Sequence, residues 1–272
     1  MIELYNYKHN SSIFRYMDFT KFMSMLTSSA LYFPTIYELS QMDPFECNFT
    51  KNDKKRLKRL YSIYNFTPKD IDTINNLRTI YMKNTLVSSW TLNPSESVAM
   101  WKVYLSSNEG VVIKTSVEKL NFELSNDIIE PLIQEVVYTD FNTDKDAISM
   151  WNEDKNIPSA FESEYFVAYA KSLLNKNFKE VDIIEQLHKF FIELLLLKRK
   201  EYSYANEVRV IIPNYKKYFP DKIVKVNLLN IIDEIIVSPY AAKWFLELVK
   251  SCWIKYFPNN PIKIYQSSIL NN

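Results

Sequence analysis

The alternation of apolar and polar side chains is clearest in residues 202–213, which we predict to form a strand around which the chain is organised. Val208 and Val210 alternate there with Glu207 and Arg209. Because successive side chains of a strand point to opposite faces, the valines share one face, and the carboxylate and guanidinium share the other. A structural salt bridge is the common interpretation of such a pair, and a functional site is the alternative.

Apolar runs and helical spacing predict the remaining elements. Further strands are expected at residues 13–16, 30–33, 85–91, 111–113, 135–138, 223–226, 235–237 and 262–265. Helices are expected at residues 19–26, 68–83, 97–105 and 241–253. Between about residues 140 and 200 helical patterns prevail.

Two signals delimit the helices of that region. Ser159 and Glu162 have capping-box spacing, and Lys198-Arg199-Lys200 supplies the positive charge that favours a helix C-terminus. The sequence therefore predicts an α+β protein: one domain over residues 1–272, with a strand-rich core and a helical insertion at about 140–200.

The residue inventory excludes several classes of site. Gly110 is the only glycine, and phosphate loops of the P-loop and Rossmann kinds need several. Two histidines and no Cys-x-x-Cys pair make a zinc site of the Cys/His type a poor fit. Chemistry here would rest on carboxylates, hydroxyls, arginines and aromatic rings, and we expect no metal.

Two distant cysteines, Cys47 and Cys252, make no disulfide framework and suggest a reducing cytoplasm, and the hydropathy suggests no membrane span. The net charge is +1, so attraction to a polyanion would need a local patch. The longest apolar run, residues 190–197, is too short to cross a bilayer. Residues 51–59 hold six basic residues and one acid, which is typical of a solvated helix face, with a phosphate-binding patch as the alternative.

Several short motifs together resemble a widespread bacterial family known only as a domain of unknown function. They are Phe14-Arg15-Tyr16, Met42-Asp43-Pro44-Phe45-Glu46, Met100-Trp101, Gly110-Val111-Val112-Ile113, Asn206-Glu207-Val208-Arg209 and Ile235-Ile236-Val237-Ser238-Pro239. The same stretches are similar to the three motifs of the ADP-ribosyltransferase fold in its arginine–serine–glutamate version. That resemblance implies a split β-sheet core and NAD as a substrate.

The resemblance also implies roles for individual residues. Arg15, on the first strand, would hold the phosphates or ribose of NAD, and Ser89-Trp90-Thr91 would support the nicotinamide pocket. Glu207 would be catalytic, with Arg209 beside it in the NAD site. An aromatic wall for the nicotinamide ring would come from Tyr16, Trp90 and Trp101. We expect Arg15 to face Glu207 across a cleft that binds the dinucleotide, although Arg15 could instead pair with Asp43 or Glu46.

The acceptor is less defined. In the ADP-ribosyltransferases that this chain resembles, those acting on protein arginine usually carry a second glutamate two positions before the catalytic one, and others carry glutamine, where this chain has Ala205. That difference argues against arginine and leaves the acceptor open. The resemblance to transferases that modify messenger RNA, with the basic runs at 51–59 and 198–200, implies a nucleic acid, RNA before DNA, and a toxin of a phage-defence system that a partner antitoxin protein neutralises. Two alternatives stay open: an inactive module that senses NAD or a related nucleotide, and a metal-dependent nuclease with Asp43, Glu46 and Glu207 as ligands.

Overall fold

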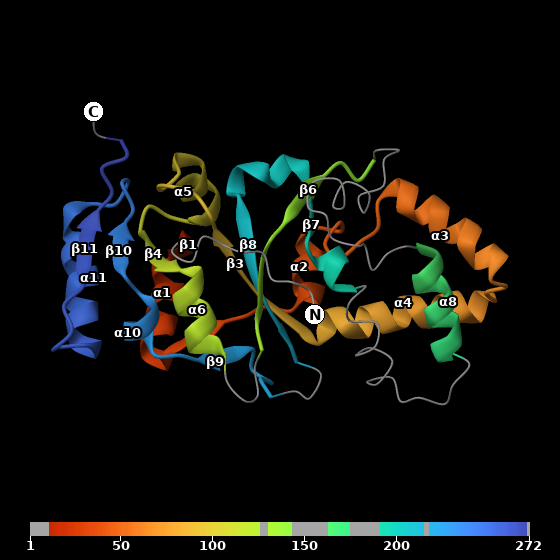
Figure 1. The fold of residues 1–272 in the computed structure, drawn as a ribbon. Helices are drawn as coiled ribbons and strands as arrows, with labels where there is room; N and C mark the ends of the chain where they lie inside the picture. The colour runs from red at the N-terminus through yellow and green to blue at the C-terminus, as the bar shows by residue number, and fades with distance from the viewer. Residues whose placement is uncertain (1–10, 126–129, 143–162, 175–190, 215–217, 271–272) are drawn as a thin grey trace.

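A seven-stranded sheet forms the centre of the computed structural model, which describes residues 11–125, 130–142, 163–174, 191–214 and 218–270 (Figure 1). The strand order is β11-β10-β4-β1-β3-β8-β5. All neighbouring strands are antiparallel except β10 and β11. The strands are β1 (Ser12–Asp18), β3 (Thr85–Thr91), β4 (Gly110–Ser116), β5 (Leu132–Glu135), β8 (Glu207–Pro213), β10 (Glu234–Val237) and β11 (Lys263–Gln266).

Two small sheets and a set of helices surround this sheet. β2 (Ala30–Tyr32) pairs with β9 (Ile223–Lys225), and β6 (Val137–Thr139) pairs in parallel with β7 (Leu197–Arg199). The helices are α1 (Phe19–Ser28), α2 (Ile36–Met42), α3 (Lys51–Ile63), α4 (Pro68–Lys83), α5 (Val98–Tyr104), α6 (Val117–Leu124), α8 (Ser163–Leu174), α10 (Leu228–Ile231) and α11 (Lys243–Tyr256), with a 3-10 helix at Lys200–Ala205. The α+β class predicted from the sequence is confirmed.

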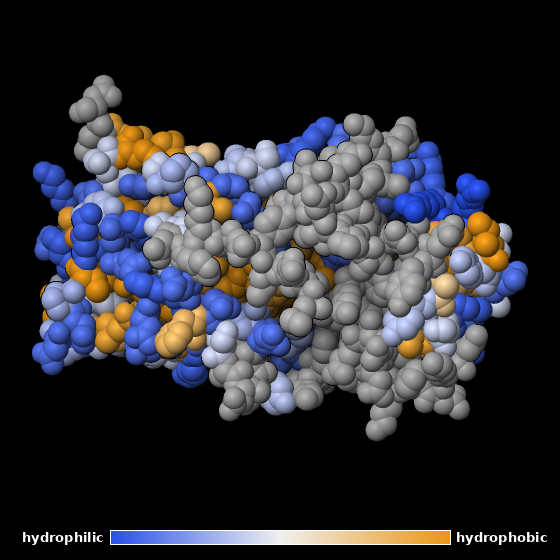
Figure 2. Space-filling model, in the orientation of Figure 1, coloured by the Kyte–Doolittle hydropathy of each residue, from blue (hydrophilic) through white to orange (hydrophobic). Residues whose placement is uncertain are grey.

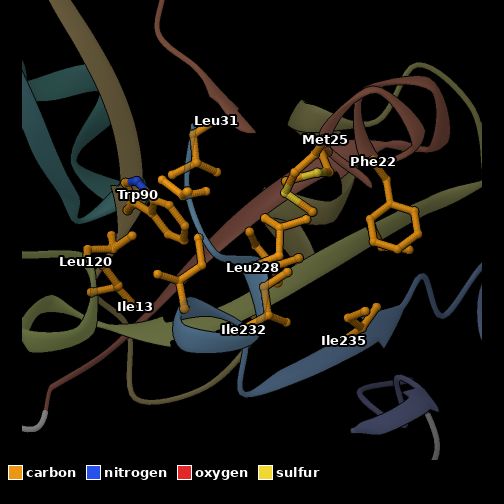
Figure 3. Packing of buried hydrophobic residues seen from close by; sticks show 14 of the residues in the cluster. Ile13, Phe22, Met25, Leu31, Trp90, Leu120, Leu228, Ile232 and Ile235 are labelled. Atoms are coloured by element: carbon orange, nitrogen blue, oxygen red, sulfur yellow. The ribbon is translucent and has the colours of Figure 1, made fainter. Parts of the chain in front are cut away.

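The first face of the sheet, which carries Ile13, Trp90 and Val210, bears the largest apolar core. Side chains of α1, α6, α10 and α11 pack against it, and Figure 3 shows Phe22, Leu120 and Leu228 among them. Burial of these side chains is the main stabilising contribution of the fold, at roughly 1.5–3 kcal/mol each.

The second face, which carries Phe14, Val87 and Glu207, is covered by two separate apolar clusters. One lies under α5 and includes Tyr16 and Trp101. The other joins Val87 and Ile211 to α2, α3, α4 and α8, which extend from the sheet on the right of Figure 1. Between these clusters the second face carries charged side chains, and the candidate site lies there.

Two local predictions are wrong. Lys198 and Arg199 do not end a helix: the helical segment stops at residue 195, and their backbone pairs with β6 as strand β7. The strand expected from residue 202 begins at Glu207, because residues 200–205 form the 3-10 helix and Asn206 adopts a left-handed conformation with φ 41°.

Other predictions for the helical insertion can be followed only in part. Residues 163–174 and 191–195 are helical, whereas the capping pair Ser159 and Glu162 lies outside the described residues. Among the helices that the structure describes, none is long and apolar enough to cross a membrane.

Candidate functional site

The candidate site is a network of charged side chains centred on Glu207. Glu207 is the first residue of β8, and its carboxylate accepts three bonds. Ser89 Oγ on β3 and Arg209 Nε each donate to Glu207 Oε1 at 2.7 Å, and Lys198 Nζ lies 2.8 Å from Oε2. Strand parity places Glu207, Arg209 and Ser89 on one face, so the sequence-based prediction of a shared face is confirmed for the first two.

A second carboxylate completes the network. Arg209 Nη2 lies 2.8 Å from Glu46 Oε2, and Lys198 Nζ lies 3.0 Å from Glu46 Oε1. Arg209 Nη1 also donates to the Leu195 carbonyl oxygen. Each of the two carboxylates thus contacts both cations. We use the name Glu207 network for Glu46, Ser89, Lys198, Glu207 and Arg209. It links β8 to β7, to β3 and to the segment after α2.

The network keeps Glu207 ionised. Burial alone would raise the pKa of Glu207, but the charges of Arg209 and Lys198 outweigh it and lower the pKa to about 2. In turn Glu207 and Glu46 raise the pKa of Arg209 against the effect of burial. At neutral pH Glu207 is therefore a negative charge held in place by Arg209, Lys198 and Ser89.

The network is reached from solvent through partly exposed groups. Lys198 retains 15% of its side-chain surface, and Ser89 is partly exposed, whereas Arg209 is fully buried. Tyr104 on α5 and Tyr204 are each 42% exposed. Partial burial, followed by the charge of Glu207, raises the pKa of Tyr104.

Further tyrosines border the network. Tyr138 on β6 accepts a hydrogen bond from the Glu207 backbone N–H at 2.8 Å, which fixes the start of β8. The ring of Tyr202 lies between two cations: Lys198 Nζ is 5.2 Å and the Arg199 guanidinium carbon 5.1 Å from its centroid. A planar ligand that entered beside Glu207 would meet several aromatic rings.

Arg15 does not face Glu207, so that expectation is wrong. Arg15 shares the first face with Ile13 and Met17, where its guanidinium lies 5.6 Å from the Trp90 ring and donates to the Tyr32 carbonyl at 3.0 Å. Glu207 points to the second face. The alternative pairing of Arg15 with Asp43 or Glu46 is not found among the interactions of the described residues.

Trp90 likewise belongs to the first face. It is 2% exposed, packs in the largest apolar core and donates from Nε1 to Ser88 Oγ. The side chain of Trp90 therefore points to the opposite face of the sheet from Ser89 and Glu207, and it cannot line a pocket around the Glu207 carboxylate.

The remaining predicted residues lie on the second face. Thr91 is the register partner of Glu207 across β3 and β8, and Phe14 is paired with Thr91 on β1. Tyr16 and Trp101 pack edge to face with ring centroids 5.1 Å apart, and both are almost fully buried. Their rings form the core under α5, so in this conformation neither presents a free face to a ligand.

The metal ligands expected for a nuclease do not converge. Asp43 Oδ2 lies 3.4 Å from Arg199 Nε, while Arg209 and Lys198 lie between the carboxylates of Glu46 and Glu207. Cations thus occupy the position that a metal ion would need. Within the ranges that the structure describes, no cluster of three or more side chains suited to a metal ion is present.

Sequence reasoning placed Ser89 and Arg209 at the site but missed two other partners of Glu207, Lys198 and Tyr138. Lys198, Tyr138 and Tyr202 were not expected at the site, and Glu46 was placed there only as a metal ligand. Glu46 is 163 residues from Arg209 and 152 from Lys198. One signal could have predicted the ion pair between Glu46 and Arg209. It is the acidic turn motif Asp43-Pro44-Phe45-Glu46, which offers carboxylates to an arginine on an otherwise apolar strand.

The comparisons agree with the motifs over the later part of the site. Residues 100–210 match a family model described as a protein of unknown function, DUF2971. The matched residues include residues 100–104 of α5, all of β7 and the start of β8, and hence Trp101, Lys198, Glu207 and Arg209. The expected resemblance to a domain of unknown function is confirmed for this segment. No curated protein and no solved structure matches the chain.

Proposed function

We propose that the protein is an NAD-dependent ADP-ribosyltransferase in which Glu207 acts on the ribose next to nicotinamide. The hydrogen bond of 2.7 Å from Ser89 Oγ to Glu207 Oε1 carries this proposal. It joins the serine and the glutamate of two expected motifs, on neighbouring strands and the same face of the sheet. Partly exposed tyrosines around the pair provide aromatic surface for a flat ring.

The chemistry needs a fixed negative charge more than a proton carrier. Nicotinamide leaves with the electron pair of the glycosidic bond, and the ribose carbon becomes oxocarbenium-like. The acceptor then forms its bond to that carbon and releases its proton to solvent water. A carboxylate held ionised by Ser89 and Arg209 can stabilise the cation and accept hydrogen bonds from the ribose hydroxyls. The low pKa of Glu207 suits this role.

The phosphates of NAD need a cation other than Arg15. Arg199, next to Lys198 on β7, retains a third of its side-chain surface and is held between Phe45 and Tyr202, with its guanidinium carbon 5.1 Å from both ring centroids. We assign it the phosphate contact, since a guanidinium binds phosphate by two parallel hydrogen bonds.

The residue two positions before Glu207 and the basic runs of the chain bear on the acceptor. Ala205 is buried and carries no carboxylate that could orient an arginine side chain. This argues only against protein arginine as the acceptor. The basic residues of α3 and of residues 198–200 favour a polyanion, so we propose a nucleic acid acceptor, RNA rather than DNA, and the setting of a toxin that an antitoxin protein neutralises during phage defence.

Transfer of label from NAD is the direct test. Purified protein, NAD labelled in the adenylate part and total cell extract should give labelled RNA, separated from DNA and protein by nuclease and protease digestion. Glu207→Gln should lower the rate by about 10²-fold or more, because the charge is lost while the side-chain volume is kept. Glu201→Gln, in the exposed 3-10 helix just before the site, is the matched control and should retain full activity.

The same variant separates the transferase from a nucleotide sensor. A sensor would bind NAD without consuming it, and Glu207→Gln would leave its measured output unchanged. If neither NAD consumption nor labelled product is found with any fraction of the extract, the proposal is wrong.

A further inference from the structure

A hollow lined by lysines and phenylalanines lies beside the Glu207 network. It has a volume of about 410 Å³ and is lined by Phe45, Phe49, Lys51, Lys54, Lys55, Lys58, Phe141 and Asn142. Its lysines come from α3, and its rings come from the segments that follow α2 and β6. None of the contacts described for the Glu207 network uses this hollow.

The lysines form one stripe along α3. Lys51, Lys54 and Lys58 are spaced three and four residues apart, so they lie on one side of the helix, and all are exposed. From Lys51 to Lys58 the helix rises about 10 Å, which is more than one phosphate can span. Asp53, the single acid of α3, is buried in the capping box with Thr50.

This positive charge is local. The whole chain has a net charge of +1, whereas α3 carries six basic residues and one acid. Figure 2 shows a strongly hydrophilic surface where α3 lies. Partial burial is the main cause that lowers the pKa of Lys54; the charge of Arg78 adds to it, and the charge of Asp53 opposes it.

The three phenylalanine rings beside the lysines, the aromatic wall of the hollow, are fixed in position; Phe49 and Phe141 are buried, and Phe45 is the partly exposed one. Phe45 is half-buried, with its ring centroid 5.1 Å from that of Phe141. The Lys51 backbone N–H donates to the Phe141 carbonyl at 2.9 Å, so the wall and the start of α3 are tied together. Arg78 lies 5.7 Å from the Phe49 ring centroid and donates to the Cys47 carbonyl, which supports the wall from behind.

We infer that this hollow binds single-stranded nucleic acid, with phosphates along the lysines of α3 and a base against Phe45. A row of cations beside aromatic rings is the arrangement that holds an unpaired strand without sequence preference. An acidic peptide would use the lysines but not the rings, and a duplex would hide its bases from them.

The position of the hollow relates it to the proposed reaction. Phe45 lines it, the next residue, Glu46, belongs to the Glu207 network, and Arg199 stacks on Phe45 at 5.1 Å. A strand seated here would have a neighbouring nucleotide close to Glu207. This inference rests on the proposed function only for the role of the strand as acceptor; binding itself does not require NAD.

Binding is tested with the full chain and a fluorescein-labelled RNA of 12 mixed nucleotides, followed by anisotropy. The triple variant Lys51→Gln, Lys54→Gln, Lys58→Gln should bind at least about tenfold more weakly. Its slope of log affinity against log salt should fall by about 2, because each phosphate contact on a single strand contributes about 0.7. Circular dichroism shows whether the variant is folded.

Matched variants decide whether the effect is local. Lys243→Gln, Lys250→Gln, Lys255→Gln removes the same charge from α11 and should leave binding unchanged. Phe45→Leu should weaken binding several-fold with an unaltered salt slope, whereas Phe122→Leu at an exposed site on α6 should have no effect. Equal losses in the α3 and α11 variants would overturn the inference.

The choice of ligand gives further outcomes. The same RNA and the corresponding single-stranded DNA should both bind, a duplex should bind more weakly, and ADP should compete only at far higher concentration. Equal binding of the duplex, or competition by ADP at the concentration of the strand, would overturn the assignment to a single strand. Acceptor-free NAD consumption by the α3 variant should be unchanged, so loss of strand binding and failure of the transferase proposal are distinguishable.

Discussion

Arg209 is the fully buried cation of the Glu207 network, and it pairs with both of the network's carboxylates. It is fully buried and lies within 2.8 Å of carboxylate oxygens of both Glu207 and Glu46. Buried ion pairs contribute little net stability when complete, but removal of one partner leaves uncompensated charge.

We predict that Arg209→Met lowers the free energy of unfolding by about 3–5 kcal/mol, because two buried carboxylates lose their shared cation. Urea denaturation followed by fluorescence measures this. Lys200→Met, which removes the exposed pair with Asp140, is the control and should cost less than about 1 kcal/mol. Equal effects of the two variants would show that the network is not stabilising as described.

The pH dependence of stability follows from Glu207. Its pKa is about 2 in the folded protein, below the value of about 4.3 of an unperturbed glutamate. The ionised form therefore stabilises the fold above about pH 4.3, and this contribution is lost as the pH falls toward 2. Its size is about 3 kcal/mol by linkage.

We predict that the stability difference between wild type and Glu207→Gln is constant above about pH 5 and shrinks steadily between pH 4 and 2. Denaturant midpoints across this range measure it. Glu201→Gln should follow the wild-type curve within about 1 kcal/mol, since Glu201 is exposed. A difference independent of pH down to 2 would contradict the ion pairing of Glu207.

The sequence predicts which residues of one strand share a face of the sheet. It does not predict which residues of different strands do. Parity on one strand correctly paired Glu207 with Arg209. Arg15 was misplaced because both faces of β1 are buried: Ile13 and Met17 pack on one side, Phe14 and Tyr16 on the other. Because neither face of β1 is polar, the sequence does not show whether Arg15 or Phe14 points to the same face of the sheet as Glu207.

At the scale of elements, the start of β4 depends on the single glycine. A Cβ added to Gly110 would lie 2.9 Å from Leu105 Cδ1 and 3.0 Å from the Met17 carbonyl oxygen. The close approach of the α5–β4 connection to β1 therefore leaves no room for a side chain. Gly110 also pairs with Asp18, the cap of α1.

We predict that Gly110→Ala destabilises the protein by about 1–3 kcal/mol through overpacking. In a Leu105→Ala background the cost should fall, because the side chain that the new methyl meets is gone. A double-mutant cycle of thermal or urea unfolding measures the coupling. If the free-energy costs of the two substitutions are simply additive, the strain of Gly110→Ala arises at the Met17 carbonyl and not at Leu105.

Helices and strands were predicted correctly where local apolar spacing and capping residues determine the structure without competition from tertiary contacts. Strands at residues 85–91 and 235–237 and the helix beginning at Pro68 follow local apolar spacing and caps. Lys198 and Arg199 were assigned to a helix end because positive charge is favoured there. Tertiary pairing of β7 with β6, together with the carboxylates of Glu46 and Glu207, overrides that local preference.

At the scale of the molecule, the Glu207 network joins the sheet to the helices on the right of Figure 1. Glu46 belongs to the segment between α2 and α3, while Arg209 belongs to β8. The apolar cluster of α2, α3, α4 and α8 is separate from the core on the first face. The ion pair between Glu46 and Arg209 is thus one of the polar links between these helices and the sheet.

We predict that Glu46→Gln speeds hydrogen exchange of backbone amides in α3 before those of β1 and β4, since the charge that anchors the preceding segment to Arg209 and Lys198 is lost. Exchange followed by mass spectrometry measures this. Glu118→Gln on α6 serves as the control for the loss of one carboxylate from a helix on the first face. Uniformly faster exchange over the whole sheet would contradict a local role for Glu46.

The chain distances within the network have a consequence during protein synthesis. Glu46 leaves the ribosome early, but its partners Lys198 and Arg209 follow only after more than 150 further residues have been added. Translation must therefore pass residue 209 and release it from the exit tunnel before any copy can assemble this centre. A nascent chain stalled earlier carries the lysine-rich helix without the carboxylate pair.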